Sequence, residues 1–497
     1  MKRMRWLASL ALVGLVAAAC GAAQEVAESD GGTVEERAAT VEDVVTDDDD
    51  GEEDAEEGDG EEGDDEDVGA DDDDAGDDPV EAEAIEFAAD FGVTDDTIRV
   101  GLSADLTGDF AGLAEPIVDA QRAYFDRLNE NGGIAGRDVE LVILDNGFDI
   151  PTHLDNYAAL SEESDAGVVM ISQSTGSPHT SAIAEQLVAD DLIAIPLSWY
   201  SGWADAELGS NVFELHTNYC FESMNGVEFL LEQSDVEDPT LAILSLPGEY
   251  GRDGATGAKL AAAELGIEVV FDGEAQVVPG GDDFTAVVSQ LVATDPDIVW
   301  ITADANALAQ ILGGAAAQDL DALWSGNQPT YNPVLLGTDV GPAIEQFYFA
   351  SSYTALWGSN DSPGMQDIMS ELQDRLPGGT YAVADSYVFG WTEAIFTEAV
   401  LRQAAANGDM TRAGVVAAAN EVTVDFQGLA PDQSWAGDPN DFIVRGSFIY
   451  EIDASTATLN TSITQPGSAG YSLVRENFVG TVAAAHDYDQ PCLPTEG

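Results

Sequence analysis

Basic side chains are scarce in this chain of 497 residues. It has 15 Lys and Arg residues against 95 Asp and Glu residues, which gives a formal net charge of −80. The only lysines are Lys2 and Lys259. Because nucleic acids and anionic lipids are bound mainly through Lys and Arg, the composition argues against both as direct partners of the folded chain.

Histidine and cysteine are also rare. The four histidines, His153, His179, His216 and His486, are scattered along the chain. Neither G-x-S-x-G nor H-E-x-x-H occurs, so the sequence carries no such signature of a nucleophile with its base or of a zinc site. We therefore expect no enzymatic activity, no metal and no cofactor, and keep an exported hydrolase only as an alternative.

Long apolar runs are confined to the beginning of the chain. Residues 1–20, MKRMRWLASLALVGLVAAAC, place three basic residues before a short apolar core, which is typical of an export signal and short for a membrane span. Ala17-Ala18-Ala19-Cys20 resembles a bacterial lipobox, so we predict that Cys20 carries lipid. The alternative is an ordinary cleaved signal with a cysteine near the cut.

A long acidic segment follows the signal. Residues 25–86 hold 32 of the 95 acidic residues and no aromatic side chain. Such a composition cannot bury enough apolar surface to offset the entropy of ordering. We predict a disordered acidic tether over residues 21–90. If Cys20 is acylated, Cys220 and Cys492 remain, and the oxidising exterior favours a disulfide between them, although both could also stay free.

The stretch NENGGIAGR (129–137) contains three glycines but does not have the direction of a phosphate loop. Phosphate loops lead from a strand into a helix, whereas here a helical pattern precedes the glycines. We expect Gly132 and Gly133 to end that helix and Ala135-Gly136 to reverse the chain into the next strand.

Apolar strands alternate with amphipathic helices from residue 97 onward. We predict the strands 97–102, 138–146, 167–172 and 192–196, a helix with Pro116 in its first turn after a loop to Ala114, and helices near 151–163 and 178–189. The alternation resumes from Cys220 to about residue 352. A helical run over 381–405 and a strand-rich end from Phe442 complete the pattern. Such a chain is typical of two doubly wound α/β lobes with parallel sheets.

Five motifs together resemble a known family. They are IRVGLSADLTGDFAG, NENGGIAGRDVELVILDN, EYGRDGATGAKLAAAELG, DDFTAVVSQLVATDPDIVW and ANALAQILGGA. In this order they are similar to the leucine/isoleucine/valine-binding group of ABC-importer substrate-binding proteins, over roughly residues 96–450. The resemblance implies the periplasmic-binding-protein type I fold, in which three crossovers join two Rossmann-like lobes. We place lobe 1 at 91–216 and 354–446, lobe 2 at 217–353 and 447–497, and the crossovers near Thr217, Tyr353 and Gly446.

The resemblance also implies a ligand site between the lobes. In relatives, hydroxyl and N–H groups of the first lobe hold a ligand carboxylate, and an acid with tyrosines meets the ammonium. Carried over by position, the predicted ligand-binding residues are Ser174, Thr175, Leu197, Ser198, Trp199, Tyr200, Tyr250, Asp304 and Gln328. The glutamate of the leucine-binding proteins is missing near Asn327 and Gln328, which weakens the case for an α-ammonium group.

Several of these positions have other readings. Trp199, Tyr200 and Trp203 suggest a flat or apolar ligand wall, but one or two of them, Trp203 in particular, could pack against the lobe. Asp304 could be the N-cap of the following helix. We expect His179 at the rim of the site.

The expected function is that of a solute-binding lipoprotein. It would capture a small polar ligand, an amino acid or a related carboxylate or amide, and deliver it to the permease of an ABC importer. We expect a monomer on the outer side of the bacterial cytoplasmic membrane, held there only by its lipid. A binding protein that senses a ligand through a membrane receptor is the main alternative.

Overall fold

The computed structural model describes residues 87–206, 208–281, 283–375, 380–382, 385–462 and 468–493. The signal segment, Cys20 and nearly all of the predicted tether lie outside these residues. In the part of the chain that is described, no helix is long and apolar enough to cross a membrane.

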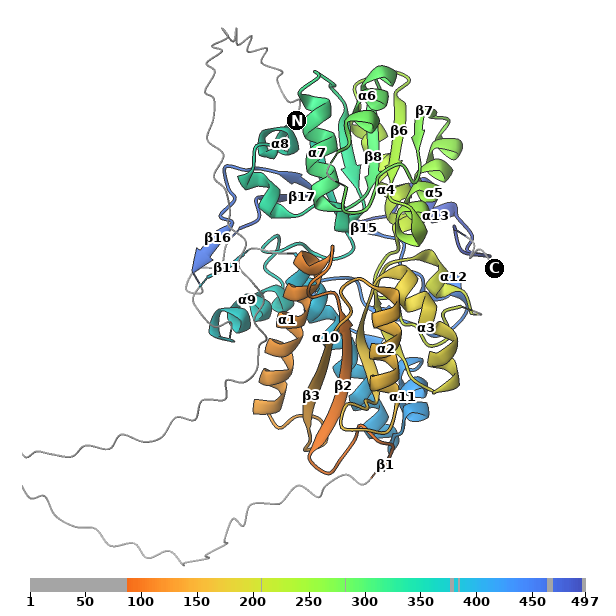
Figure 1. The fold of residues 1–497 in the computed structure, drawn as a ribbon, viewed down its shortest axis with the longest axis vertical. Coiled ribbons are helices and arrows are strands. Elements are labelled where there is room, and N and C mark those ends of the chain that lie inside the picture. Colours follow the sequence, from red (N-terminus) through yellow and green to blue (C-terminus); the bar gives the residue numbers. More distant parts are fainter. Residues whose placement is uncertain are drawn as a thin grey trace, which may run out of the picture. The chain divides into compact units, whose positions relative to one another are not determined.

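The first lobe is built on a four-stranded parallel sheet in the order β3-β2-β4-β5 (Figure 1). Its strands are β2 (Thr97–Ala104), β3 (Asp138–Asp145), β4 (Met170–Thr175) and β5 (Ala194–Leu197). Its helices are α1 (Ala111–Glu130), α2 (Ile150–Ser161), α3 (Ser177–Ala189), α9 (Pro363–Arg375), α10 (Ser386–Asn407) and α11 (Arg412–Ala419).

The second lobe is built on a seven-stranded sheet in the order β17-β15-β10-β9-β8-β6-β7. The strands from β7 to β10 are parallel, whereas β15 and β17 add antiparallel pairs. These strands are β6 (Thr240–Ser245), β7 (Glu268–Gly273), β8 (Ile298–Thr302), β9 (Leu323–Gly326), β10 (Tyr348–Ser352), β15 (Ser447–Ile452) and β17 (Tyr471–Phe478). The helices are α4 (Tyr219–Gln233), α5 (Gly248–Leu265), α6 (Thr285–Thr294), α7 (Ala305–Ala316), α8 (Gly341–Phe347) and α13 (Thr481–Ala485).

Short elements complete the described chain. They are the pairs β1 (Ala88–Ala89) with β12 (Asp409–Met410), β11 (Thr380–Ala382) with β16 (Asn460–Ser462), and β13 (Thr423–Val424) with β14 (Gln433–Ser434), and the helical turn α12 (Pro439–Phe442).

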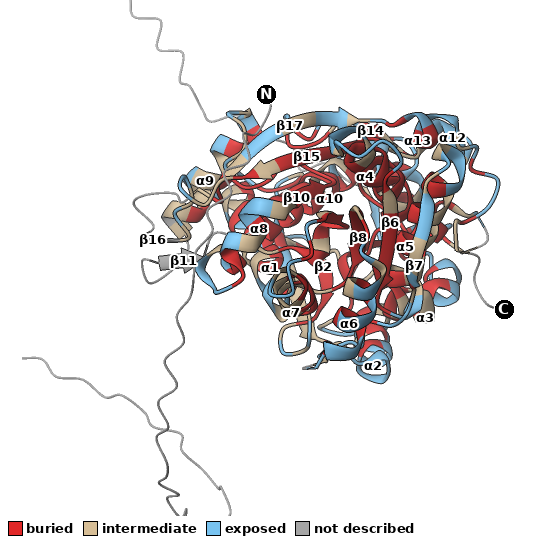
Figure 2. Ribbon diagram, turned by 90° about the horizontal axis from the view of Figure 1, so that it is seen from above, coloured by how far each residue is buried: buried red, intermediate tan, exposed pale blue. Residues whose placement is uncertain are grey.

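Each sheet is covered by helices on both faces. Neighbouring residues of one strand, Met170 and Ile171 of β4, belong to two different apolar clusters, the first with α1 and α10 and the second with α2 and α3. Alternate residues of a strand point to opposite faces, so both faces are buried. Leu241 and Ala242 of β6 divide between two clusters in the same way. Figure 2 shows buried central strands and exposed outer strands, β7 and β17, in the second lobe. The predicted pair of doubly wound lobes is confirmed.

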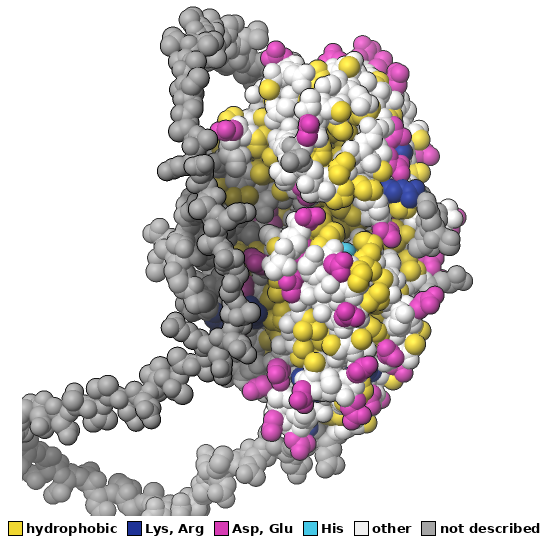
Figure 3. Space-filling model, viewed as in Figure 1, with side chains coloured by type: hydrophobic (Ala, Val, Ile, Leu, Met, Phe, Trp, Pro, Cys, Tyr) yellow, Lys and Arg dark blue, Asp and Glu magenta, His cyan; other side chains and the backbone are white. Residues whose placement is uncertain are grey.

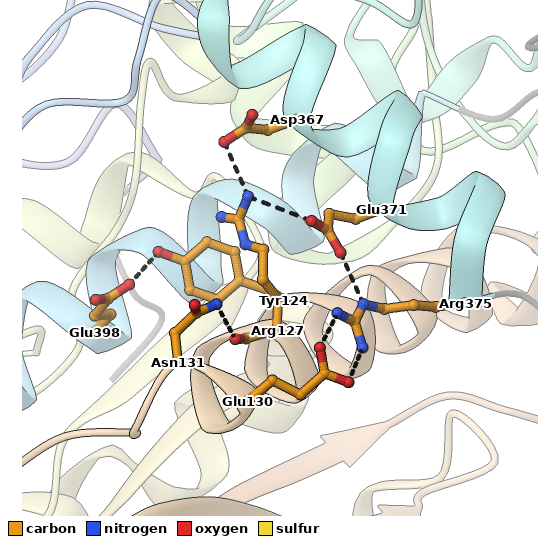
Figure 4. A network of polar contacts seen from close by, with 8 residues as sticks. All are labelled: Tyr124, Arg127, Glu130, Asn131, Asp367, Glu371, Arg375 and Glu398. Carbon is orange, nitrogen blue, oxygen red and sulfur yellow. Dashed lines mark hydrogen bonds and ion pairs between the residues drawn. The ribbon is translucent and has the colours of Figure 1, made fainter. Parts of the chain in front are cut away.

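Ion pairs fix α9 to α1 in the first lobe (Figure 4). Arg127 of α1 lies 2.9 Å from the Asp367 carboxylate of α9, and Arg375 of α9 lies 2.7 Å from Glu130 of α1. The Tyr124 hydroxyl donates to Glu398 of α10. A chain with few basic residues thus uses two of them to position one helix.

Two predicted helix starts are wrong. Helix α1 begins at Ala111, so Pro116 lies inside the helix instead of in its first turn. The Asp105 carboxylate accepts the N–H groups of Gly108 and Phe110. These hydrogen bonds fix the loop before Ala111, so the helix begins earlier than predicted. The helical run expected from Tyr381 begins only at Ser386, because residues 380–382 form β11 and pair with β16.

The glycine-rich stretch behaves as predicted. Gly132, Gly133 and Gly136 all have positive φ, and the Gly133 N–H donates to the Leu128 carbonyl, which closes the end of α1. Ile134 and Arg137 exchange two backbone hydrogen bonds that reverse the chain into β3.

The chain passes between the two lobes three times. The passes lie between β5 and α4, between β10 and α9, and between α12 and β15. Two of the passing segments run side by side, because Thr217 and Val444 form a parallel bridge and the Thr217 hydroxyl donates to the Val444 carbonyl at 2.8 Å. The exact lobe boundaries given above stay a prediction.

Candidate ligand-binding site

The predicted hydroxyl donors are bonded inside the first lobe. Ser174 and Thr175 end β4, and both side chains are buried. The Ser174 hydroxyl lies 2.7 Å from the Thr180 hydroxyl and 3.2 Å from Nε2 of His153. The Thr175 hydroxyl accepts a hydrogen bond from the Gln173 amide at 3.1 Å. Their role as ligand donors stays a prediction.

Two histidines lie close to these hydroxyls. His153 is fully buried, and burial lowers its pKa to about 3, so the ring is neutral and connects Ser174 with Ser103. The prediction that His179 lies at the rim is wrong. Its ring is 2% exposed and packs between Phe148 and His153.

The loop after β5 divides its side chains between two environments. The Ser198 hydroxyl lies 2.6 Å from that of Ser177 and accepts the Trp203 indole N–H at 3.1 Å. The Tyr200 hydroxyl donates to the Leu493 carbonyl at 2.5 Å, and Trp203 packs edge-on against Tyr200. Tyr200 and Trp203 therefore pack near the C-terminal tail. For Trp203 this agrees with the alternative that it packs against the lobe. Leu197 is buried in the first lobe.

Trp199 instead belongs to an aromatic cluster formed by both lobes. Its indole stacks on Tyr353, with ring centroids 4.3 Å apart and an interplanar angle of 27°. Tyr219 lies 4.6 Å from Tyr250 and 6.2 Å from Trp199, and Phe389 approaches Trp199 at 5.4 Å. We call these five residues the interlobe aromatic cluster. It brings the predicted residues Trp199 and Tyr250 together through two tyrosines.

The cluster draws on separate parts of the chain. Trp199 follows β5 and Phe389 lies on α10, both in the first lobe, whereas Tyr219 begins α4 and Tyr250 lies on α5. The Tyr250 hydroxyl donates to the Ala303 carbonyl at 2.7 Å. Relative motion of the lobes would therefore separate Trp199 and Phe389 from the tyrosines of the second lobe.

A buried carboxyl group adjoins the aromatic cluster. Glu222, in the first turn of α4, accepts the Asn327 amide at 2.7 Å and the Gln328 N–H at 3.1 Å. Burial raises the pKa of Glu222 to about 8, and the hydrogen bonds from Asn327 and Gln328 offset this only in part. This group can change its protonation state near neutral pH.

Gln328 connects this carboxyl group with a cavity between the lobes. Its N–H donates to Glu222, while its side chain lines a cavity of about 150 Å³. The other lining residues come from the starts of α1, α7 and α10 and from the segment after β9: Asp109, Phe110, Gly112, Leu113, Asp304, Ala305, Asn306, Pro329, Tyr331, Asn332, Pro333, Asp385 and Ser386. Residues of both lobes therefore line this cavity, which is partly open to solvent.

Asp304 is the N-cap of α7 and also a lining residue of the cavity, and its role in ligand binding stays a prediction. Its carboxylate accepts the Ala307 N–H at 2.9 Å and so caps α7, and the same side chain lines the cavity. An Asp at an N-cap uses one oxygen for the helix and keeps acceptor capacity for another donor.

Sequence reasoning missed several residues of this region. Tyr219, Glu222, Phe389, Asp109 and Asp385 were not predicted, and Tyr353 was assigned only to a crossover. One signal was available, because Glu222 falls on the apolar face of the segment YCFESMNGVEFLL, where an acid needs partners. The others depend on how the two lobes meet.

The chain was compared with known proteins. The family model described as periplasmic binding protein matches residues 97–457. A leucine-, isoleucine-, valine-, threonine- and alanine-binding protein of Pseudomonas aeruginosa is 26% identical over 260 residues, which are 50% of this chain and 65% of that protein. The chain thus spans slightly less than two thirds of that relative.

Solved structures agree with this match. A fatty acid ABC transporter substrate-binding protein from Thermomonospora curvata aligns with a TM-score of 0.71 and 26% identity, over 80% of this chain and 97% of that one. A branched-chain amino acid ABC transporter protein from Thermus thermophilus with bound valine aligns with a TM-score of 0.65 and 17% identity, over 80% and 98% of the two chains.

The fold and the family match define the class of protein. Two doubly wound lobes joined by three chain passages are the type I architecture of periplasmic binding proteins. The chain belongs to the periplasmic binding protein family. The resemblance noted from the five sequence motifs is confirmed.

Proposed function

We propose that this protein is a solute-binding lipoprotein that captures a small polar ligand between its lobes and delivers it to an ABC importer. The ligand would be an amino acid or a related small molecule, bound outside the cytoplasmic membrane. Family membership supports the coarse function, and the first relatives in the comparison are named for amino acids or a fatty acid.

The observation that carries this proposal is the contact region between the lobes. Aromatic rings from both lobes meet beside the buried Glu222, and Gln328 connects that carboxyl group with a cavity that both lobes line. A site formed by two lobes closes around its ligand, so binding and lobe motion are coupled.

The direct test is a ligand screen. We expect the purified chain to gain thermal stability with one class of small molecule, because a ligand at a hundred times its Kd adds about 2.7 kcal/mol to the free energy of unfolding. Isothermal titration calorimetry would then give the affinity. A screen of amino acids, amides, amines and carboxylates without any stabilising compound would count against the proposal.

Membrane anchoring through Cys20 needs a separate test, since this residue lies outside the described residues. We expect the Cys20→Ser variant to leave the membrane fraction for the soluble exported fraction. A shorter chain that begins at Phe87 should bind the same ligand as tightly as the mature chain, because the predicted tether lies outside every family motif. Membrane retention of the serine variant, or a tenfold loss of affinity in the shorter chain, would contradict these expectations.

Uptake and sensing can be separated genetically. If the protein serves an importer, deleting its gene should abolish uptake of the radiolabelled ligand, and genes for permeases and ATPases should lie nearby. If it acts through a receptor, uptake should continue while the transcriptional response to the ligand disappears.

A further inference from the structure

The cavity between the lobes has a one-sided charge. Asp109, Asp304 and Asp385 line it, and no Lys or Arg is among its lining residues. None of these three carboxylates forms an ion pair with a basic side chain of the described residues. Figure 3 shows acidic side chains over much of the visible face and basic ones at only a few places.

The three acidic residues line the cavity from different segments of the chain. Asp304 caps α7, and Asp109 lies near Gly280 of the second lobe. Asp385 accepts the Trp357 N–H at 3.0 Å and the Tyr471 hydroxyl at 2.5 Å. Within the described ranges, no group of three His, Cys, Asp or Glu residues could share a metal ion. The arrangement therefore suits an extended organic cation better than a metal.

Two residues that line the cavity each have a buried polar atom without a partner among the described residues. Gln328 is 4% exposed and Tyr331 is 6% exposed, and both line the cavity. The Gln328 Oε1 and the Tyr331 hydroxyl form no hydrogen bond with any described residue. A buried acceptor without a partner is costly, and Oε1 can only accept, so it calls for a donor such as the N–H of an amine.

Aromatic rings complete the wall. Phe110 and Tyr331 line the cavity. Aromatic faces attract cations, and the attraction grows where water is excluded. Acids, acceptor oxygens and aromatic rings together favour a positively charged group.

The site offers little to a ligand carboxylate. The Ser174 and Thr175 hydroxyls that the family resemblance assigns to it are bonded within the first lobe and do not line the cavity. Three acidic side chains would repel the carboxylate of a ligand. The overall charge of −80 attracts cations from solution.

We propose that the interlobe cavity binds the ammonium group of a small organic amine, and that the ligand carries a net positive charge. This inference rests on the proposed function, since it names the class of ligand for the same site. The volume of about 150 Å³ suits the end of a small molecule rather than a drug-sized one.

The test uses probes that share one side chain and differ in whether they carry an ammonium group, a carboxylate or both. Isoamylamine, leucine and 4-methylpentanoate form one such set, and tyramine, tyrosine and 3-(4-hydroxyphenyl)propionate form a second. Thermal shift and calorimetry with the full chain should show binding of the amine in at least one set. The matching anion should not bind, and the zwitterion should bind at least tenfold more weakly than the amine.

Two variants test whether the cavity acids are responsible. Asp304→Asn removes the charge but keeps a residue that caps helices well, so the melting temperature should not change while amine affinity falls at least tenfold. Asp149→Asn is the matched control, because Asp149 caps α2 by the same contact and lies outside the cavity. The control should bind the amine like the parent chain.

The outcomes separate this inference from the proposed function. If an anion or a zwitterion binds and the amines do not, the cationic ligand is ruled out and the solute-binding function stands. Unchanged amine affinity in Asp304→Asn would also overturn the cavity assignment. If no probe and no library compound binds, both proposals fail.

Discussion

Ser201 donates two hydrogen bonds to Asp253, and these bonds join the two lobes. The Ser201 N–H lies 3.0 Å and its hydroxyl 2.6 Å from the Asp253 carboxylate of α5. Ser201 also holds the C-terminal tail, because its carbonyl accepts the Tyr488 hydroxyl at 2.6 Å and its Oγ accepts the Cys492 N–H at 2.9 Å. One serine thus connects three separate parts of the chain.

Replacing Ser201 with alanine should destabilise the protein more at pH 8 than at pH 5. Burial raises the pKa of Asp253 to about 7, and the Ser201 donors counteract this shift. At pH 8 the carboxylate is charged, so losing the hydroxyl should cost about 1.5–3 kcal/mol of unfolding free energy. At pH 5 the folded state holds the proton, and the loss should be smaller.

Denaturant unfolding of Ser201→Ala at the two pH values checks this prediction. Ser210→Ala is the control, because Ser210 is exposed. Equal losses of unfolding free energy at pH 5 and pH 8 would show that Asp253 does not have the raised pKa that its burial indicates.

Replacing Glu222 with glutamine should flatten the dependence of stability on pH. The pKa of Glu222 is raised from 4.5 to about 8 by burial. Between these values the folded state keeps a proton that the unfolded chain releases, so stability falls as pH rises, by up to about 1.4 kcal/mol per pH unit. Glu222→Gln should lose this contribution, whereas exposed Glu140→Gln should follow the parent chain.

Unfolding free energies at pH 5, 6.5 and 8 give the slope directly. Parallel slopes for Glu222→Gln and the parent chain would contradict the prediction.

Removing the disulfide should lower stability by about 2–5 kcal/mol. Cys220 of α4 is bonded to Cys492, across a sequence separation of 272 residues. We expect Cys220→Ser and Cys492→Ser to have equal effects and the double variant to add little, because all three remove the same bond. Calorimetric melting with and without a reductant checks this, and additive losses would indicate that the two cysteines act independently.

Trp199 should report lobe motion. It stacks on Tyr353, so separation of the lobes must change the surroundings of its indole. We expect Trp199→Phe to lose more than half of the ligand-induced change in tryptophan emission. Trp324→Phe, in the core of the second lobe, should keep it. An unchanged signal in Trp199→Phe would place the reporter elsewhere.

Most of the fold could be predicted because it depends on local patterns. The strand predicted over residues 97–102 begins at the first residue of β2, and Gly132 and Gly133 end α1 as expected. One error arose at a local side-chain contact and the other at a distant strand pairing. The start of α1 depends on the Asp105 carboxylate, and residues 380–382 form a strand because they pair with β16.

The candidate site was less accessible to sequence reasoning. Of the residues carried over from the family motifs, Trp199, Tyr250, Asp304 and Gln328 lie near the lobe contact, and their role in ligand binding stays a prediction. No local pattern could pair Trp199 with Tyr353, since the two are 154 residues apart and meet only when the lobes do. Ser174 was predicted as a ligand donor, and its hydroxyl contacts His153 of α2 and Thr180 of α3. These contacts depend on how the two helices pack, which no local pattern could indicate.

The pairing of Cys220 with Cys492 also orders events in the life of the chain. Cys492 follows both lobes in the sequence, so the bond cannot form before all of their strands have been synthesised and exported. The tail that Ser201 holds is consequently the last part to be secured. Material folded in a reducing cytoplasm would reach the same lobes without that final covalent step, and its tail would depend on hydrogen bonds and on apolar contacts such as those of Tyr488.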